Sequence, residues 1–297
     1  QYIYIGLRGL PRVVRFNRGS ETIDDDFSLG GDFVFGNYYA EDIEVFPDDP
    51  FSIAVARRIF TMLPYDAGVA IFKNGIMEPN IVSSDWQNRS ISFAIGNKTL
   101  YGYYSNDSFN DGLNKMTIDD DGIQLDTFYK ELFTISNEQI EYSNGVLYSR
   151  RGQAVDVTTE HPTFLGNYDL GEYTSYGAVE PADSLDRIYF GTHSFGDPYY
   201  VKIFNKSTFD FLGEFEIPLT GSNGEFYDII KWGDDSKLAI NIKNATAIPS
   251  DGVTPGHRIV IIDNAPVSNQ NISHSDLHQF KVYPNPTIDN FIIKSSS

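Results

Sequence analysis

Cysteine is absent from the 297 residues of this chain. This absence excludes disulfide bonds, thiolate nucleophiles, zinc–thiolate sites and cysteine-held iron–sulfur clusters. Long apolar runs are also missing: no window approaches the roughly 20 apolar residues of a membrane-spanning helix, so we expect no such helix. Basic residues are few, with 22 Lys and Arg against 41 Asp and Glu and a net charge of −19. That charge repels phosphate backbones and argues against a nucleic-acid partner.

Sequence motifs of known catalytic and metal sites are missing as well. None of the five histidines has a metal-ligand spacing, and His274 and His278 lie in a polar tract that we interpret as a linker. Neither a G-x-S-x-G elbow nor a glycine-rich phosphate loop occurs. Only Trp86 and Trp232 are available where quinone-dependent enzymes use repeated tryptophan motifs. We therefore predict no metal and no cofactor, and we assign no catalytic residue.

Tyrosine and phenylalanine are abundant, and they occur in short alternating runs bounded by Gly, Asn and Asp. This pattern is typical of β-strands joined by turns. No segment keeps a 3.6-residue apolar period for three turns, and the nearest, Ala54 to Leu63, ends at Pro64. We expect an all-β fold with little helix.

The runs recur as couples of strands, such as QYIYIGL with RVVRFNRGS and DRIYFGTH with YVKIFNKST. About six couples are found, and their equivalent points are spaced by about 49, 48, 47, 41 and 50 residues: Tyr4, Ile53, Tyr101, Tyr148, Tyr189 and Ala239. Further strands lie upstream, as in AEDIEVFP, and downstream, as in FLGEFEI. Four strands in each period of this length predict a β-propeller of six or seven four-stranded blades. A β-sandwich is the alternative, although its strands need not repeat in fours.

QYIYIGL and YVKIFNKST also resemble the repeats of YVTN and lactonase-like β-propellers, over most of residues 1 to 265. Several blades depart from that pattern, and the Gly-His and Trp-Asp signature of WD repeats is missing. The first couple begins at Tyr2, so we expect the first strand of its blade to lie upstream of Gln1. The expected propeller is therefore incomplete at its N-terminus.

Acidic residues gather at Asp24–Asp26, at Asp119–Asp121 and in SNDSFNDG from Ser105. Loops of this composition can bind calcium, but none has the spacing of a calcium hand. Asp-Gly and Asn-Asp tolerate the positive φ angles of hairpin turns, and we favour that interpretation.

Paired tyrosines are the candidate ligand contacts, because such pairs can stack on sugars or anchor a protein partner. The alternative is that one member of each pair faces the core. The six residues are Tyr38, Tyr39, Tyr103, Tyr104, Tyr199 and Tyr200. A further candidate is Ser184, because Asp183-Ser184-Leu185 resembles the O-glycosylation motif of secreted Bacteroidetes proteins.

The last residues read KVYPNPTIDNFIIKSS from Lys281. They contain a turn motif, Val282, Tyr283, Pro284, Asn285 and Pro286, followed by an alternating apolar strand. This stretch resembles the start of the C-terminal sorting domain of the type IX (Por) secretion system in Bacteroidetes. The resemblance implies export across the outer membrane, with the translocon and its outer-membrane shuttle protein as partners of this segment.

These observations predict three parts: a β-propeller at 1–266, a polar linker at 267–279, and the first strand of a truncated β-sandwich sorting domain at 280–297. We expect the chain to be a segment of a longer precursor, and the protein to be secreted or displayed at the cell surface. We expect the propeller to be a binding or interaction module whose partner is a surface protein or a polysaccharide. Two alternatives stay open: a propeller lyase or hydrolase acting on polysaccharide or lactone, and a structural cap of a larger adhesin.

Overall fold

A computed structural model describes residues 2–7, 10–59, 66–83, 87–94, 96, 98–104, 111–130, 132–133, 139–171, 177–193, 198–217, 224–232, 237–244, 257–262, 280–284 and 291–295. The chain divides into two compact units. Unit 1 comprises 1–145, 157–162 and 289–297, and unit 2 comprises 146–156 and 163–288. We describe each unit by itself. In the described residues no helix is long and apolar enough to cross a membrane.

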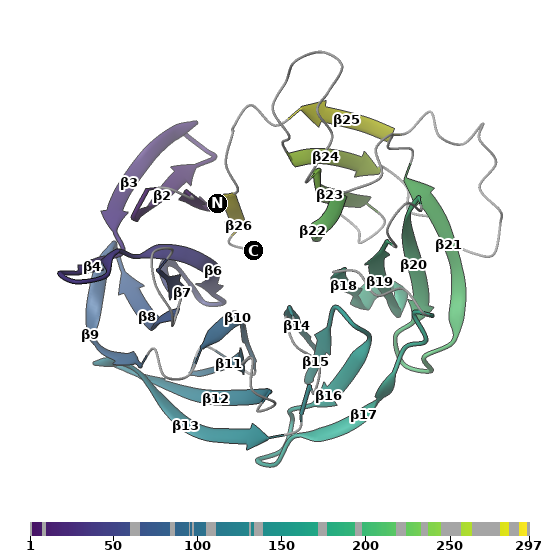
Figure 1. Ribbon diagram of the computed structural model, residues 1–297, viewed down its shortest axis with the longest axis horizontal. Helices are drawn as coiled ribbons and strands as arrows, with labels where there is room; N and C mark the ends of the chain where they lie inside the picture. The colour runs from purple at the N-terminus through teal and green to yellow at the C-terminus, as the bar shows by residue number, and fades with distance from the viewer. Residues whose placement is uncertain are drawn as a thin grey trace. The chain divides into compact units, whose positions relative to one another are not determined.

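The described strands form the four-stranded blades of a β-propeller (Figure 1). Blade 1 contains β26 (Phe291–Ser295), β1 (Tyr2–Leu7), β2 (Arg12–Asn17) and β3 (Thr22–Ser28), in that order. Blade 2 contains β6 (Tyr39–Phe46), β7 (Asp49–Arg58), β8 (Asp66–Lys73) and β9 (Ile76–Val82). Blade 3 contains β10 (Asn88–Phe93), β11 (Thr99–Tyr104), β12 (Gly112–Asp119) and β13 (Gly122–Lys130). Blades 2 and 3 join into one eight-stranded sheet through a parallel pair, Gly122 and Asn80.

Three more blades follow. Blade 4 contains β14 (Ile140–Ser143), β15 (Val146–Ser149), β16 (Gln153–Asp156) and β17 (Thr163–Asn167). Blade 5 contains β18 (Ala178–Ala182), β19 (Arg187–Thr192), β20 (Tyr199–Asn205) and β21 (Phe211–Ile217), with a 3₁₀ turn η2 (Asp183–Leu185). Blade 6 contains β22 (Gly224–Trp232), β23 (Lys237–Asn244), β24 (His257–Ile262) and β25 (Phe280–Pro284).

The repeat points predicted from the sequence all lie in second strands, namely β1, β7, β11, β15, β19 and β23. The core explains why these strands are so apolar. In unit 1 one buried cluster joins side chains of blades 1 and 2, and another joins blades 2 and 3. A strand such as β7, with a sheet packed on each face, buries six consecutive residues. Strands buried on both faces read as continuous apolar runs, which is how the couples stand out in the sequence.

Equivalent bulges confirm the internal repeat at the level of register. In blades 1 and 3 the fourth strand carries one extra residue opposite the third, Asp24 in β3 and Asp126 in β13. Each extra carboxylate pairs with a basic residue of the third strand: Arg15 Nε lies 2.8 Å from Asp24, and Lys115 Nζ lies 3.4 Å from Asp126. Bulges recur at fixed positions because they set the local twist of the sheet.

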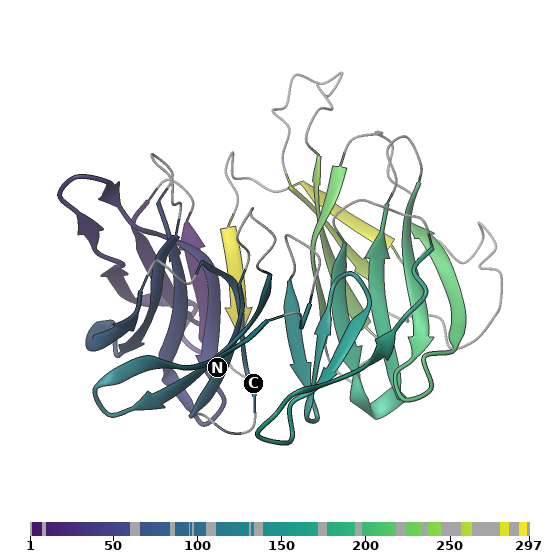
Figure 2. The ribbon, with the colours of Figure 1, turned by 60° about the horizontal axis from the view of Figure 1, so that its bottom comes forward.

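The two strands at the C-terminus complete blades instead of forming a separate domain. β25 pairs with β24, and β26 pairs with β1 from Ile3–Ser295 to Leu7–Phe291. Figure 2 shows β26 as a yellow strand beside the purple strands of unit 1. This differs from the predicted sorting-domain strand at 280–297. It also corrects the expectation that the first strand of blade 1 lies before Gln1: β26 pairs with β1 and so occupies an edge that would otherwise expose unpaired backbone groups.

Candidate functional site

Each blade has two chemically different ends. We call the end where the first strand meets the second, and the third meets the fourth, the turn end. The opposite end, where the second strand ends and the third begins, we call the polar end. The buried polar side chains found there are Arg57 and Asp66 in blade 2, Asn88 and Asn114 in blade 3, Ser149 and Gln153 in blade 4, and Thr192 and His193 in blade 5. This concentration makes the polar end the candidate site.

Arg57 is the second-last residue of β7 and is 2% exposed. Its guanidinium donates to backbone carbonyls, Nη2 to Ala67 O at 3.0 Å and Nη1 to Leu29 O at 3.4 Å. The same group lies 5.1 Å from the ring centre of Tyr38. Burial lowers the pKa of Arg57. With its hydrogen bonds directed at backbone, Arg57 serves as a fixed positive charge beneath the polar end.

Asp66 begins β8 and is 8% exposed. Its Oδ1 accepts a hydrogen bond from Gly68 N at 2.6 Å. Burial, with a smaller contribution from the charge of Glu41, raises the pKa of Asp66 to about 7 despite the lowering effects of Gly68 N, Arg89 and Arg57. A carboxyl with this pKa exchanges protons near neutral pH, as groups at functional sites often do.

Bulges in two first strands place charges beside Asp66 in unit 1. The register of β6 skips Glu41 between Ala40 and Asp42, and the register of β10 skips Arg89 between Asn88 and Ser90. Glu41 Oε1 accepts a hydrogen bond from Arg58 Nη1 at 2.7 Å. Bulges turn a side chain away from the regular alternation and are frequent next to functional sites.

Below the bulges, first strands are joined by side chains bonded to backbone. Asp42 Oδ2 accepts hydrogen bonds from Ile91 N at 2.9 Å and from Ser90 Oγ at 3.3 Å. Ser90 Oγ in turn accepts from Ile140 N at 3.1 Å. This relay runs from β6 through β10 to β14 within unit 1, and it holds the polar ends of these strands in place.

Asn88 and Asn114 form a buried amide pair in blade 3. Asn114 Nδ2 donates to Asn88 Oδ1 at 3.0 Å, while Asn88 Nδ2 has no hydrogen-bond partner among the described residues. The pair requires glycine at position 102, because a Cβ there would lie 2.1 Å from Asn88 Oδ1. An unfilled buried donor costs roughly 1–3 kcal/mol, so its retention points to a bound polar group.

Unit 2 has the same character at its polar ends. Ser149 Oγ accepts hydrogen bonds from Arg151 N at 3.3 Å and Gln153 N at 3.2 Å. Gln153 Oε1 and Thr192 Oγ1 are buried and lack a hydrogen-bond partner within the described part of the chain. The ring of His193 stacks on that of Tyr199, with centres 4.3 Å apart and planes 14° apart. Unit 2 thus has two buried oxygen atoms with unused hydrogen-bonding capacity at its polar ends, one in blade 4 and one in blade 5.

The predicted tyrosine contacts divide into two groups. Tyr38, Tyr39 and Tyr200 are partly exposed and stay candidates for ligand contact. Tyr103, Tyr104 and Tyr199 are buried, at 0, 8 and 1% exposure, which corrects the interpretation of these three as surface contacts. Both Tyr103 and Tyr104 belong to β11, whose last five residues are all buried, so neither neighbour reaches the surface.

The described acidic clusters form ion pairs or turn hydrogen bonds with other residues of the protein. Asp24–Asp26 lie in β3 and not in a turn, where they pair with Arg15 and Arg12. Asp119 Oδ1 accepts from Asp121 N at 2.9 Å, which confirms the turn interpretation for that tract. Asn106, Asp107 and Asn110 lie outside the described residues. Where side chains are described, no group of three or more metal-ligating residues is found.

Ser184 is exposed in η2, and Asp183 beside it pairs with Lys206. Of the predicted sorting motif, Val282, Tyr283 and Pro284 lie in β25, whereas Asn285 and Pro286 are outside the described residues, as are His274 and His278.

The polar-end residues were missed from the sequence because each is a single polar residue at the margin of an apolar strand. One sequence signal for the bulges was available. In AEDIE (40–44) and NRSIS (88–92), charged or polar residues follow one another where the residues of a strand should alternate between polar and apolar. Such a break marks a bulge, although the partner strand is needed to locate it.

No family model matches the chain, and no curated protein matches its sequence. Solved structures share its fold. A Bacteroides caccae protein of unknown function is 8% identical with a TM-score of 0.58, over 94% of this chain and 96% of the other. TolB from Acinetobacter baumannii is 13% identical with a TM-score of 0.55, over 98% of this chain and 65% of the other. The Swd1 β-propeller domain of Myceliophteria thermophila is 9% identical with a TM-score of 0.58, over 80% and 75%. At these identities the likeness establishes the β-propeller fold alone.

Proposed function

We propose that this protein is a binding module that takes a polar, largely uncharged ligand, such as a polysaccharide or a polar segment of a surface protein, at the polar ends of the blades of unit 2. The observation that carries the proposal is a pair of buried polar atoms of unit 2 without hydrogen-bond partners in the described residues: Gln153 Oε1 and Thr192 Oγ1. Unpaired buried groups are costly in a free protein and become satisfied when a ligand supplies the missing hydrogen bonds.

The proposal is tested by calorimetric titration of the protein with a panel of neutral oligosaccharides. Replacing Gln153 by Leu together with Thr192 by Val removes two acceptors with little change of volume. We expect this double variant to bind at least about ten-fold more weakly. Thr208→Val, at an exposed turn end, is the matched control and should bind as the wild type does. Equal affinity of the double variant and the wild type would refute a site at the polar end of unit 2.

A second candidate function is a propeller lyase or hydrolase acting on polysaccharide or lactone, and Asp66 favours it. A carboxyl with a pKa of about 7 can serve as a general acid or base near neutral pH. If the protein turns over such substrates, Asp66→Asn should lower kcat by about 100-fold or more with little change in KM. A variant with full activity would leave the binding function as the better explanation.

We further propose that the protein is exported by type IX secretion to the medium or the cell surface, with the translocon and its shuttle protein as partners of the C-terminal segment. The motif from Val282 to Pro286 supports this. Because β25 and β26 complete blades, deleting the tail would damage the fold as well as the signal. A sharper test joins residues 280–297 to an unrelated secreted reporter and substitutes Asn285 and Pro286 by Ala. Export of the reporter only with the intact motif would support the route, and export without it would oppose it.

A further inference from the structure

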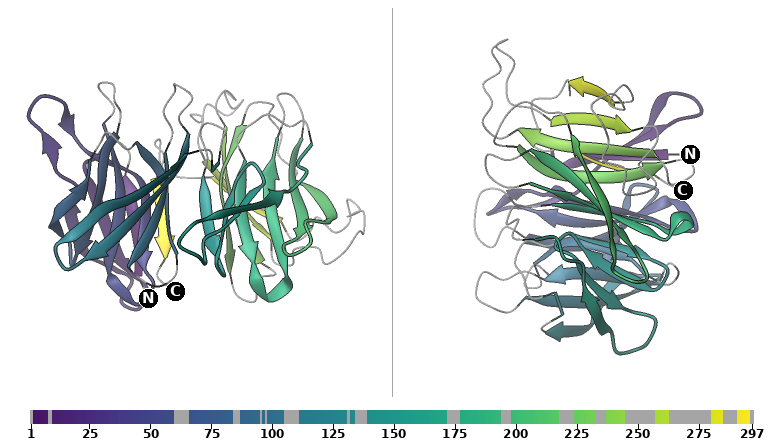
Figure 3. Two further views of the ribbon diagram at one scale, coloured as in Figure 1. Left: turned by 90° about the horizontal axis from the view of Figure 1, so that it is seen from below. Right: turned by 90° about the vertical axis from the view of Figure 1, so that its right-hand side faces the viewer.

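A short hairpin in unit 1 lies outside every blade. It consists of β4 (Gly31–Asp32) and β5 (Gly36–Asn37), inserted between β3 and β6. The tip between them is Phe33, Val34 and Phe35, with exposures of 104, 72 and 38%. In Figure 3 the hairpin is the dark purple loop that projects at the far left of the first view. Contiguous exposed apolar residues on a projection are typical of an interaction surface.

The tip is held in one conformation by its own hydrogen bonds. Asp32 Oδ1 accepts from Val34 N at 2.7 Å and from Phe35 N at 3.0 Å. The base is closed by Tyr38 N donating to Gly30 O at 3.1 Å. Gly36 has a φ of +88°, which the turn requires and which a larger residue would resist. A preorganised tip loses little conformational entropy on binding, as an anchor of an interface should.

The segment of sequence that contains the hairpin is acidic, and the buried guanidinium of Arg57 lies beside its base, 3.4 Å from Leu29 O. From Gly19 to Ala56 the chain has ten Asp and Glu and no Lys or Arg. Four of these acids are paired with arginines from outside the segment: Asp24 and Asp25 with Arg15, Asp26 with Arg12, and Glu41 with Arg58. The segment around the apolar tip therefore keeps a negative excess, which attracts a cationic surface and repels anionic lipid.

We propose that Phe33 and Val34 anchor a protein–protein interface by inserting into an apolar pocket whose rim carries Lys and Arg. This rests on the proposed binding function and extends it to a second surface, separate in the chain from the acceptors Gln153 and Thr192. The apolar tip supplies affinity, and the acidic segment supplies orientation and rate of association.

The test uses a fluorescein-labelled amphipathic Leu/Lys peptide, whose apolar face is bordered by lysines, as a defined probe of this chemistry. Binding is followed by fluorescence anisotropy with the full chain at low and high salt. The variant Phe33→Ser/Val34→Ser should bind at least about ten-fold more weakly than the wild type at both salt concentrations. Ile76→Ser, which replaces an equally exposed residue of β9 (72%), should stay within about two-fold of the wild type.

Equal binding of the peptide by the wild type and the double variant would overturn the proposal, because charge alone would then explain the affinity. Co-sedimentation of the wild type but not the variant with phosphatidylcholine vesicles would replace it by a membrane anchor. If sedimentation velocity shows that the wild type self-associates and the double variant does not, the hairpin would instead be a contact between two copies of this chain. Unchanged oligosaccharide titration of the hairpin variant separates failure of this proposal from failure of the polar-end site, and an unchanged thermal melt confirms folding.

Discussion

The turn ends and the polar ends of the blades contain similar residue types but use them differently. At the turn ends, Asn and Asp side chains close their own turns: Asn17 Oδ1 accepts from Gly19 N at 2.8 Å, and Asn205 Oδ1 accepts from Thr208 N at 2.7 Å. At the polar ends, Asn88, Gln153 and Thr192 are buried with hydrogen-bonding capacity left over in the described residues.

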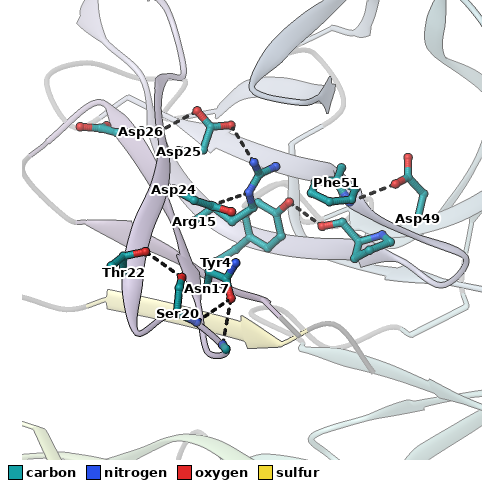
Figure 4. A network of polar contacts seen from close by, with 12 residues as sticks. Tyr4, Arg15, Asn17, Ser20, Thr22, Asp24, Asp25, Asp26, Asp49 and Phe51 are labelled. Carbon is teal, nitrogen blue, oxygen red and sulfur yellow. Dashed lines mark hydrogen bonds and ion pairs between the residues drawn. The ribbon is translucent and has the colours of Figure 1, made fainter.

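Figure 4 shows the turn end of blade 1 with its neighbouring turn in blade 2. Arg15 Nε donates to Asp24 at 2.8 Å, and its guanidinium lies 5.2 and 4.9 Å from the ring centres of Tyr2 and Phe51. Its Nη1 is buried without a hydrogen-bond partner in the described residues, so this end too keeps one unsatisfied atom. Burial alone would lower the pKa of Arg15, but hydrogen bonds to Asp24 and Tyr4 outweigh it and raise the pKa. Tyr4 donates its hydroxyl to Pro50 O at 2.7 Å.

This difference indicates that the turn ends stabilise the fold and that the polar ends are available for recognition. Satisfied local hydrogen bonds at the turn ends contribute to stability without any ligand. Buried groups without partners reduce stability in the free protein, a cost often found at functional sites. Four substitutions test this division, from the largest expected effect to the smallest.

The largest effect is expected at Asp66. Its pKa is raised from 3.8 to about 7 in the folded state, so the folded protein binds a proton that the unfolded chain has lost. The contribution of Asp66 to the free energy of unfolding should therefore fall as pH rises from about 4 to 7, by about 4 kcal/mol. In Asp66→Asn this slope should be much reduced, as measured by urea unfolding across pH. If Asp66→Asn keeps the wild-type dependence of stability on pH, then Asp66 does not destabilise the fold in this way.

Next comes Arg15, at a turn end. Arg15→Met removes the guanidinium from Asp24, Asp25 and the two rings, and we expect a loss of about 2–3 kcal/mol in urea unfolding. Arg12→Met is the matched control, because the Arg12–Asp26 pair has side chains 49 and 40% exposed and should contribute about 0.5 kcal/mol or less. Similar losses in the two variants would show that burial does not set the strength of these pairs.

A smaller loss is expected at Asn205. Asn205→Ala removes the acceptor for Ser207 N and Thr208 N, at 3.0 and 2.7 Å, and should cost about 1 kcal/mol because the turn is exposed. Gln124→Ala, at an exposed position of β13, provides a baseline for an exposed substitution. No loss in Asn205→Ala would mean that the turn ends do not stabilise the fold in this way.

The smallest effect has the opposite sign. Thr192→Val replaces a buried hydroxyl that lacks a partner in the described residues by a methyl group, so the variant should be unchanged or up to about 1 kcal/mol more stable. Thermal melting of the two proteins in ligand-free buffer measures it. A clear loss of stability would show that the hydroxyl is satisfied in the free protein, and Thr192 would then resemble the turn-end residues.

Much of the blade architecture was predictable because second and third strands are buried on both faces. The runs around Tyr101 and Tyr189 could therefore be recognised one by one. β18 was missed because its sequence, AVEPA, contains Pro181 and small residues. The bulges at Glu41 and Arg89 were not predictable, since a register exists only once a partner strand is paired.

The sequence by itself determined the all-β class, the four-stranded period and the turn at Asp119, because these depend on local alternation and on side chains that bond to nearby backbone. Tertiary structure decided where the C-terminal strands belong and which polar residues are buried. β26 has the pattern of any half-buried strand, and only its pairing with β1 makes it part of blade 1. Likewise, nothing in the sequence distinguishes Asp66 from other aspartates. Its pKa is raised because packing in the folded protein removes its carboxyl group from water.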